Sequence, residues 1–457
     1  MNSSDTLPEA GVTGLARRDT LRLGLLGLGL LSGAGALAAC GGSDDPSDEP
    51  STKVGDDGIE LVSSDVKRAA GDPSVLPDVV TGLQALTGDL YGRLAADPGN
   101  LVLSPYSVLV ALGMTLGGAA GKTAEEMSTV LGADRLGNRW HKGVNALTSS
   151  IDGRAGEKER GDKSKAEIAL ATANQIFGQR GVGWEADFLD LLAKEYGAAL
   201  RAVDFETAAE QARTQINDWV EDQTNDKIVD LIPEGVLTAL TRLVLVNAIY
   251  LKAPWEDPFE KGLTEKADFT LADGSTVQAD TMKKSDLRAS VVSGQGWQAA
   301  SIPYAGRELA MAIVLPDAGR MDAVEQRLVE AGPAEFVTGG TPGVFEVSLP
   351  KWTFRTAAPL SDALKRLGMP TAFTGEADFS PMTEEDLDLA ISDVVHQAFI
   401  AVDEEGTEAA AATAVVEGAT AVEVAERFIV DRPFLFVIHD TEHGTPLFVG
   451  RVADPTA

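Results

Sequence analysis

Side chains that could bind a metal ion are few in this sequence, which has four histidines and one cysteine among its 457 residues. His439 and His443 lie four residues apart, a spacing that puts two side chains on one face of a helix. Glu442, however, does not occupy the place of the glutamate in the zinc-protease motif His-Glu-x-x-His. The segment also lies between two apolar runs and ends at Gly444. We therefore predict an exposed turn here, and no metal or cofactor for the protein.

Motifs for nucleophilic or phosphate chemistry are missing. The sequence has no Gly-x-Ser-x-Gly elbow and no Gly-x-x-x-x-Gly-Lys-Ser/Thr loop. Gly181 and Gly183 are followed by Trp184 and Glu185, a poor match to a dinucleotide-binding loop.

Lys and Arg number 38 against 70 Asp and Glu, and the net charge of -32 argues against nucleic acid and anionic membranes as electrostatic partners. The sequence predicts a protein that is not an enzyme.

The single cysteine, Cys40, ends a segment with the plan of an export signal. Arg17 and Arg18 precede an apolar run, and small residues lead to the cysteine. This ending resembles a bacterial lipobox, whose cysteine is lipidated, and the arginine pair resembles a twin-arginine signal. An uncleaved membrane anchor is the alternative, but glycines interrupt the run, which is short for a stable span. We predict an export signal over residues 1–39 and an extracytoplasmic protein, held at the membrane by a lipid on Cys40 or released.

The segment after Cys40 is rich in Asp, Ser, Pro and Gly and poor in apolar residues. Such a composition does not bury enough apolar surface to offset the entropy of ordering the chain. We predict a disordered acidic tether over residues 40–75 and a folded domain over residues 76–457. With 44% hydrophobic residues the chain can form a large core, as one large domain or as two to three ordinary ones.

The stretch from Asp403 to Thr420 is unusual, because it begins with acidic residues, passes Gly406 and then runs through small residues without proline. Alanine favours helices, so a short helix or an Ala-rich linker is one interpretation. The other is an exposed loop that can become a strand. Side chains alternate along a strand, so with Glu408 facing water the opposite face carries only small or β-branched residues. These are Thr407, Ala409, Ala411, Thr413 and Val415.

This pattern resembles the hinge of the reactive-centre loop in inhibitory serpins. The matching hinge residues are Glu404, Glu405, Gly406, Thr407, Glu408, Ala409, Ala410, Ala411, Ala412 and Thr413, within a loop of about 404–425. Further segments between Leu76 and Pro455 resemble the family in the same order, although Ala253-Pro254 departs from its pattern. The resemblance implies an α+β serpin fold with three β-sheets, of which a large mixed sheet is central, and about eight to nine helices.

The resemblance also implies a function. A serpin of this kind is a suicide-substrate inhibitor of serine, and less often cysteine, endopeptidases, acts as a monomer, and inserts its cleaved loop into the central sheet. Counting from the hinge places the reactive bond at Thr420-Ala421, and counting back from Pro433 places it at Val422-Glu423. Both bonds follow a small uncharged residue, which favours an elastase-like or subtilisin-like target. A non-inhibitory binding lipoprotein on the same fold is the alternative, against which the small hinge residues argue.

A buried polar cluster is implied by the same resemblance. Ser104, Ser107, Asn247 and His396 match residues beneath the central strands, in the region that opens when the loop inserts, and Trp255 matches the point where insertion begins. From the local sequence alone, the apolar neighbours of His396 predict an ordinary buried core histidine.

Periodicity predicts the elements that hold these residues. Apolar positions from Val79 to Leu94 recur at helical spacing, and a second helix is expected from Gln211 to Thr224. Leu243 to Leu251 is almost continuously apolar, which is typical of a strand buried on both faces. The charged segment from Gly153 to Lys165 predicts a solvated loop, and a strand follows from Ile168.

Overall fold

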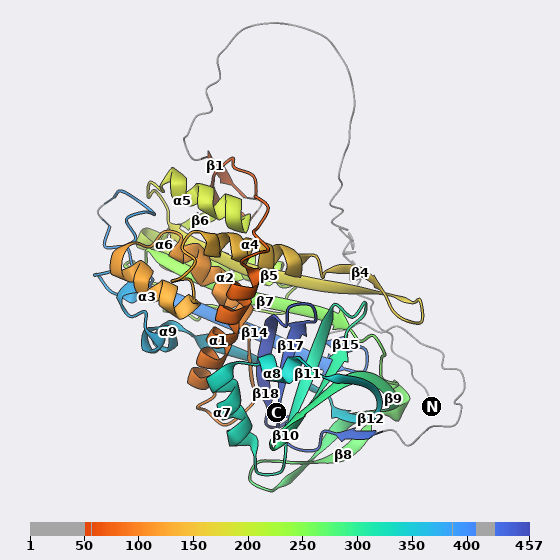
Figure 1. The fold of residues 1–457 in the computed structure, drawn as a ribbon. Helices are drawn as coiled ribbons and strands as arrows, with labels where there is room; N and C mark the ends of the chain where they lie inside the picture. Colours follow the sequence, from red (N-terminus) through yellow and green to blue (C-terminus); the bar gives the residue numbers. More distant parts are fainter. Residues whose placement is uncertain (1–50, 56, 386, 408–425) are drawn as a thin grey trace, which may run out of the picture. The chain divides into compact units, whose positions relative to one another are not determined.

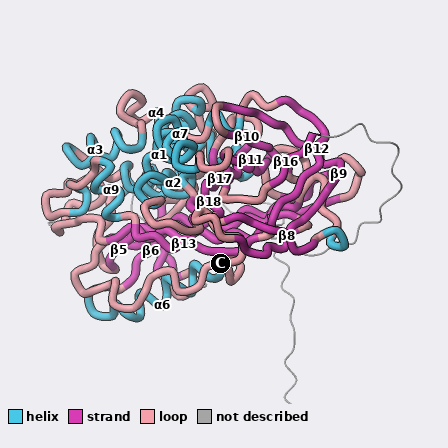
Figure 2. Tube along the Cα trace, turned by 90° about the horizontal axis from the view of Figure 1, so that it is seen from below, coloured by secondary structure: helices cyan, strands magenta, loops and turns pink. Residues whose placement is uncertain are grey.

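The computed structural model describes residues 51–55, 57–385, 387–407 and 426–457. These residues form an α+β fold in which two large sheets pack together and most helices gather over one part of them (Figures 1 and 2). The α-helices of this part of the chain are α1 Leu76–Leu94, α2 Pro105–Leu116, α3 Gly121–Leu131, α4 Arg139–Asp152, α5 Ala186–Leu191, α6 Phe205–Gln223, α7 Met321–Ala331, α8 Ala334–Val337 and α9 Ser361–Leu367, with shorter turns η1 Leu192–Tyr196, η2 Lys261–Leu263 and η3 Thr371–Phe373.

Sheet A has nine strands, in the order β1-β2-β6-β5-β7-β15-β14-β13 with β4 added beside β5. Strands β7 and β14 also pair directly, in parallel. The sheet therefore has a junction where two strands are neighbours along one part of their length and are separated by β15 at one end. Its strands are β1 Ser51–Val54, β2 Glu60–Ser63, β4 Gly156–Glu159, β5 Lys165–Gln179, β6 Leu200–Val203, β7 Leu243–Pro254, β13 Trp352–Pro359, β14 Asp393–Asp403 and β15 Gly406–Thr407.

Sheet B also has nine strands, in the order β16-β12-β9-β10-β11-β17-β18-β3 with β8 beside β9. The long strand β9 pairs with β8 over its first residues, with β12 from Thr281 to Val291 and with β10 near its end. It therefore joins two of the three expected sheets into one hydrogen-bonded path. The strands are β3 Leu101–Leu103, β8 Glu265–Thr270, β9 Thr276–Gly294, β10 Trp297–Pro303, β11 Leu309–Pro316, β12 Thr341–Pro350, β16 Glu426–Ile429, β17 Phe434–Asp440 and β18 Pro446–Val452.

The apolar run in β7 is buried on both faces, as its sequence predicts. Leu243, Leu245 and Ile249 belong to the hydrophobic cluster that contains α2, whereas Val244 and Val246 belong to the cluster that contains α6. Alternation along a strand produces this division. Asn247 follows the odd-numbered register and is fully buried, so it is a polar residue on the α2 face of an otherwise apolar strand.

Residues 51–75 correct the prediction of a disordered tether up to residue 75. Strand β2 pairs with β6 and extends sheet A, and β1 pairs with β2. Ile59 is fully buried and Val62 is 7% exposed, so this short segment contributes apolar surface that its overall composition hides. Residues 40–50, with Cys40, and the export signal over 1–39 lie outside the described residues.

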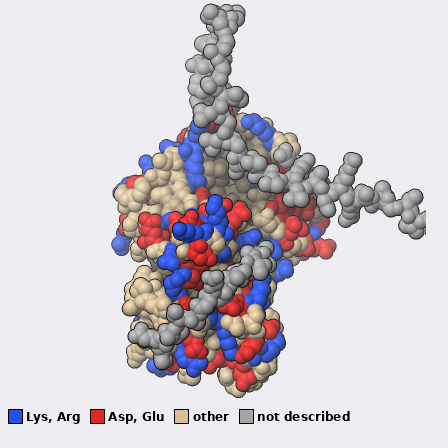
Figure 3. Space-filling view, turned by 90° about the vertical axis from the view of Figure 1, so that its right-hand side faces the viewer, with Lys and Arg blue, Asp and Glu red and all other residues tan. Residues whose placement is uncertain are grey.

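Charged side chains of both signs are intermixed on the face shown in Figure 3. This face is therefore not uniformly acidic, although the chain carries a net charge of -32. Within the described ranges, no helix combines the length and the apolar character that crossing a membrane requires.

We predict that Val62→Ala lowers the free energy of unfolding by about 1–2 kcal/mol, because it removes buried methyl groups and leaves a cavity. Val54→Ala is the matched control, since Val54 lies in the neighbouring strand and is 72% exposed. Urea denaturation of both variants measures the difference. Equal stability of the two variants would show that β2 does not contribute to the folded body.

Candidate functional site

The hinge turn, defined as Asp403–Thr407, carries the chain from β14 back between β14 and β7. Thr407 pairs with Val402 of β14 and with Ala253 of β7, in both cases antiparallel. Thr407 is only 2% exposed, on the inward register that strand alternation predicts. The first residues of the expected loop are therefore already a short strand at one end of the junction.

Gly406 makes the turn possible. Its φ of +150° is rarely adopted by residues with a side chain, and a Cβ at this position would lie 2.3 Å from the Ala253 carbonyl oxygen. The Asp403 carboxylate stabilises the same turn, because Oδ1 accepts hydrogen bonds from the backbone N–H groups of Glu405 at 2.9 Å and Gly406 at 3.3 Å. The backbone conformation of Gly406 and the hydrogen bonds to the Asp403 carboxylate thus determine the direction in which the chain leaves β14.

The two hinge glutamates are buried rather than solvated. The Glu404 carboxylate accepts hydrogen bonds from Lys351 Nζ at 2.8 Å and Thr264 Oγ1 at 2.6 Å. Burial raises the pKa of Glu404, but the hydrogen bonds that the carboxylate accepts and the charge of Lys351 together outweigh burial and hold the pKa below its ordinary value. Glu405 lies 3.3 Å from Lys261 Nζ. The hinge turn is therefore anchored by charge pairs at the end of sheet A.

Trp255 forms the floor beneath the hinge turn. Its backbone N–H donates to the Glu405 carbonyl at 2.8 Å and its indole Nε1–H donates to the Asp403 carbonyl at 3.0 Å. The indole stacks on Tyr304, with centroids 4.7 Å apart and planes at 2°. The Tyr304 hydroxyl is 2.6 Å from Thr407 Oγ1. Sequence reasoning identified Trp255 and missed Tyr304, which follows an ordinary apolar strand and carries no local signal.

The four residues expected as a buried polar cluster do lie together. All four are fully buried, and a fifth residue, Asn174 of β5, joins them. The Ser104 N–H donates to His396 Nε2 at 3.1 Å, and His396 Nδ1–H donates to Asn247 Oδ1. Asn247 Nδ2 donates to Ser107 Oγ and to Asn174 Oδ1, at 2.7 Å each. Ser107 Oγ in turn donates to Asn174 Oδ1 at 2.6 Å.

This polar cluster crosses the junction of sheet A. Asn174, Asn247 and His396 are register partners on the adjacent strands β5, β7 and β14. The bond between His396 and Asn247 therefore joins the two strands that a new central strand would separate. Sequence reasoning missed Asn174, although its register opposite Asn247 would have identified it once the strand pairing was known.

His396 is neutral in this arrangement. Its Nε2 accepts from a backbone N–H, so the ring proton lies on Nδ1, which donates to Asn247. Burial lowers the pKa of His396 to about 4. The ring is thus an uncharged hydrogen-bonding bridge at neutral pH.

A β-hairpin replaces the solvated loop predicted over Gly153 to Lys165. Strands β4 and β5 pair from Gly156–Ile168 to Glu159–Lys165. At the tip of the hairpin, Arg160 Nε donates to the Trp255 carbonyl at 2.8 Å, and the Gly161 N–H donates to Glu256 Oε1 at 2.9 Å. The hairpin therefore reaches the floor of the hinge turn.

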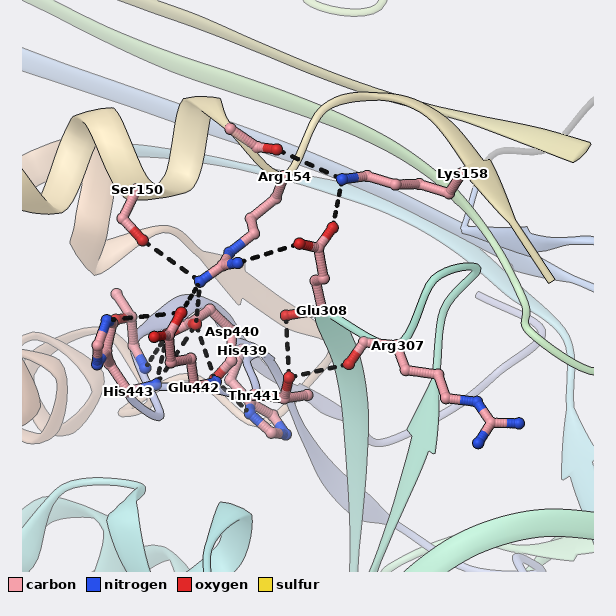
Figure 4. Close-up of polar contacts among 12 residues, drawn as sticks. Ser150, Arg154, Lys158, Arg307, Glu308, His439, Asp440, Thr441, Glu442 and His443 are labelled. Atoms are coloured by element: carbon pink, nitrogen blue, oxygen red, sulfur yellow. Dashed lines mark hydrogen bonds and ion pairs between the residues drawn. The ribbon is translucent and has the colours of Figure 1, made fainter. Parts of the chain in front are cut away.

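The base of the hairpin is tied to sheet B by an ionic network (Figure 4). Arg154 lies 3.2 Å from Glu308, 3.3 Å from Asp440 and 2.6 Å from Glu442, and Lys158 also binds Glu308. The hydrogen bond from Lys158 is the main reason why the pKa of Glu308 is lowered. Asp440 is fully buried and also accepts from backbone N–H groups of the turn that follows β17.

The exposed turn predicted from His439 to His443 is confirmed for Thr441 to His443 and wrong for His439, which is 2% exposed in β17. His439 Nε2 lies 3.0 Å from Ser301 Oγ, while His443 lies in the turn. Among the described residues, no three His, Cys, Asp or Glu side chains are grouped as metal ligands would be.

Part of the predicted reactive-centre loop lies outside the described residues. This part contains both candidate bonds, Thr420-Ala421 and Val422-Glu423, and the hinge residues Glu408, Ala409, Ala410, Ala411 and Ala412.

Comparison with known proteins gives consistent matches. The family model described as Serpin (serine protease inhibitor) matches residues 81–455. An uncharacterised serpin-like protein of Thermococcus kodakarensis is 34% identical over 90% of this chain and 93% of its own length. Leukocyte elastase inhibitor of Sus scrofa is 36% identical over 78% of this chain and 93% of its own.

Solved structures show the same fold. Serpin48 of the insect Tenebrio molitor is 30% identical, with a TM-score of 0.72, and the match covers 84% of this chain and 99% of that one. Human thyroxine-binding globulin in complex with thyroxine is 27% identical, with a TM-score of 0.73, and the match covers 84% of this chain and 100% of that one.

We predict that the stability of the protein falls as the pH falls from about 6.5 to about 4. An unfolded histidine has a pKa of about 6.5, so in this window the unfolded state binds more protons than the native state and gains free energy. Between pH 7 and pH 5, His396 alone accounts for about 2 kcal/mol of this loss. His396→Gln should flatten the pH dependence of the free energy of unfolding, measured in urea, relative to the wild type. His443→Gln is the control, and an identical slope for all three proteins would contradict the assignment.

Proposed function

The chain belongs to the serpin family, and from this premise we propose that it is a suicide-substrate inhibitor of serine endopeptidases. The observation that supports this proposal best is the position of β15. A loop that inserts must begin between β7 and β14, and Gly406 and Thr407 already pair with both strands there. Insertion of the cleaved loop would continue this strand from Glu408.

The pairing geometry provides a driving force. Below β15, β7 and β14 pair in parallel over Val244–Ile249 and Asp393–Ala398. A strand that continues β15 would be antiparallel to both neighbours and would replace one parallel ladder by two antiparallel ones. Antiparallel pairing is slightly more stable per residue. About ten new ladder bonds at roughly 1 kcal/mol each, together with burial of small side chains, set the order of the free energy gained.

The reaction follows from this driving force. The catalytic serine of the protease attacks the reactive bond and forms an acyl-enzyme, while the new amino terminus leaves. Once the bond is cut, the arm that begins at the hinge turn is free to extend β15. The protease is carried along on the ester bond and is distorted before water completes hydrolysis. The small residues from Ala409 to Ala412 support this proposal, because they present no large side chain that would block insertion.

A non-inhibitory binding protein on the same fold is the competing proposal. Thyroxine-binding globulin, a structural relative, is solved with thyroxine bound, so this fold is compatible with ligand binding. The two proposals differ in what happens to the cut arm. Incubation with elastase or subtilisin distinguishes them, since an inhibitor gives an SDS-stable covalent complex and a binding protein gives clean cleavage alone.

We predict that Ala411→Arg abolishes the SDS-stable complex and converts the protein into a cleaved substrate. Ala411 shares the inward register of Thr407, so an arginine there would be buried without a partner on insertion. Ala410→Arg is the matched control, because its side chain would face solvent and the complex should still form. Gel electrophoresis after mixing with elastase or subtilisin measures both variants. Equal complex formation would contradict the insertion register.

We further predict that mass spectrometry of the cleaved protein locates the cut at Thr420-Ala421 or at Val422-Glu423. Both bonds place a small uncharged side chain in the specificity pocket of the protease, which favours elastase-like and subtilisin-like enzymes. A cut after a lysine or arginine by a trypsin-like enzyme that also forms the complex would contradict the proposed target class.

We also propose that the protein is an exported bacterial lipoprotein, on the sequence around Arg17, Arg18 and Cys40. The expected result is incorporation of radioactive palmitate into the wild type and none into Cys40→Ser. Two or more acyl chains would hold the protein at a membrane, whereas a single chain binds reversibly. Labelling of both proteins, or of neither, would overturn the proposal.

A further inference from the structure

We propose that Glu256 is a positioning residue for loop insertion, because its carboxylate holds the floor of the hinge turn in place. This role rests on the proposed function, since it concerns the step in which the cut arm extends β15. Glu256 directly follows Trp255, and its side chain is only 2% exposed. A buried carboxylate is stable only when donors and positive charges surround it. Its partners therefore show which segments it connects.

The Glu256 carboxylate accepts three hydrogen bonds from two separate turns. Oε1 accepts from the Gly161 N–H at 2.9 Å and from Arg307 Nε at 3.0 Å, and Oε2 accepts from the Gly306 N–H at 3.1 Å. Gly161 lies at the tip of the β4–β5 hairpin, whereas Gly306 and Arg307 lie in the turn between β10 and β11. One side chain thus joins both turns to the end of β7.

The turn between β10 and β11 needs this support. Arg307 has a φ of 61°, in the left-handed region that residues with a side chain rarely adopt. Such a conformation is strained and persists only where the surrounding contacts hold it. The Arg307 N–H donates to the Tyr304 carbonyl at 2.8 Å, and the Arg307 carbonyl accepts from Thr441 Oγ1 at 2.9 Å. The bond to Glu256 adds a charge pair to these contacts, so its loss should loosen the turn.

Tyr304 connects this turn to the hinge turn. It follows β10 directly, forms a β-bridge with Trp255 and stacks on its indole. The Tyr304 hydroxyl lies 2.6 Å from Thr407 Oγ1, in the strand that the cut arm would extend. The next residue, Ala305, donates from its N–H to the Pro254 carbonyl at 2.8 Å. A shift of the turn would therefore move the Tyr304 hydroxyl away from Thr407.

The position of β15 matters because insertion competes with hydrolysis. Under the proposed function, each acyl-enzyme either is trapped by insertion of the arm or is released by water as protease and cleaved inhibitor. Insertion begins from molecules in which β15 is paired with both β7 and β14. If fewer molecules hold β15 in place, the effective rate of insertion falls with that fraction. Glu256 would thus influence the partition between inhibition and cleavage without contacting the reactive bond.

The test measures the ratio of cleaved inhibitor to SDS-stable complex after the full chain is mixed with elastase or subtilisin. Glu256→Gln keeps the size of the side chain, but it replaces one acceptor oxygen by a donor and removes the charge opposite Arg307. We expect the ratio to rise about tenfold, as for loss of a hydrogen bond to a charged group. The rate of the first attack on the reactive bond should stay unchanged. Glu260→Gln is the matched control, because Glu260 is exposed.

Tyr304→Phe distinguishes positioning from a general loss of structure. This variant removes the hydroxyl beside Thr407 but keeps the stack on Trp255, so it should raise the same ratio. Because Glu256 acts through Tyr304, the double variant should show no more than the larger of the two single effects. Effects that multiply would overturn the route through Tyr304. Thermal unfolding shows whether each variant is folded.

A second variant keeps the test decisive if Glu256→Gln does not fold. Arg307→Gln removes the same charge pair from a side chain that is 54% exposed, and it should also raise the ratio. If the wild type forms the complex and both variants leave the ratio unchanged, the role of Glu256 is overturned and the proposed function stands. If the wild type itself forms no complex, the proposed function fails, and the role of Glu256 fails with it.

Discussion

The hydrogen bond between Asn247 and His396 is the constraint on which the arrangement of sheet A depends. Both side chains are fully buried within the polar cluster, and the hydrogen bond between them exists only while β7 and β14 are neighbours. Leaving a buried polar group unpaired costs about 1–3 kcal/mol. Partial opening of the sheet at this level is therefore unfavourable, and under the proposed function this cost would keep the junction closed until the loop is cut.

The end of the junction where β15 lies is stabilised differently. There the strands are already separated, and the hinge turn is held by charge pairs at Glu404 and Glu405 and by the Trp255–Tyr304 stack. A strand that extends β15 does not have to break these contacts, because they involve residues at or before Thr407. Under the proposed function, the barrier to insertion would thus be concentrated at the polar cluster, and β15 would be the start of the new strand.

The sequence predicted much of this architecture because its periodic signals are strong. The continuous apolar run at Leu243–Leu251, the helical spacing from Val79 and the pairing of small hinge residues with Gly406 each have a direct physical meaning. Features formed by distant pairing could not be read in the same way. Asn174 became part of the cluster only through its register with Asn247, and β2 forms because β6 offers an edge.

Burial was the other property that local sequence concealed. The charged segment after Gly153 is largely exposed, as predicted, but Arg154, Lys158 and Arg160 are partly buried and bind residues far away in the chain. Similarly, His439 and Asp440 looked like part of a surface turn, and both are buried. Charge alone therefore predicts exposure poorly where opposite charges from another element lie within reach.

The β4–β5 hairpin connects the hinge turn of sheet A with the buried ionic network on sheet B. Its tip binds Trp255, at the end of β7, whereas its base binds Asp440 and Glu442 on sheet B. Strand β13, beyond β14, is joined to sheet B through the hydrogen bond from the Val102 N–H to Thr356 Oγ1 at 3.0 Å. If the proposed insertion moved β7 and β5 apart from β14, the hairpin tip would move with β7, and the displacement would have to be taken up at the base. The Glu442 side chain there is 62% exposed, which allows water to replace its bond to Arg154 at little cost. The buried Arg154–Asp440 contact lacks this option, so under the proposed function it would limit how far the hairpin can follow β7.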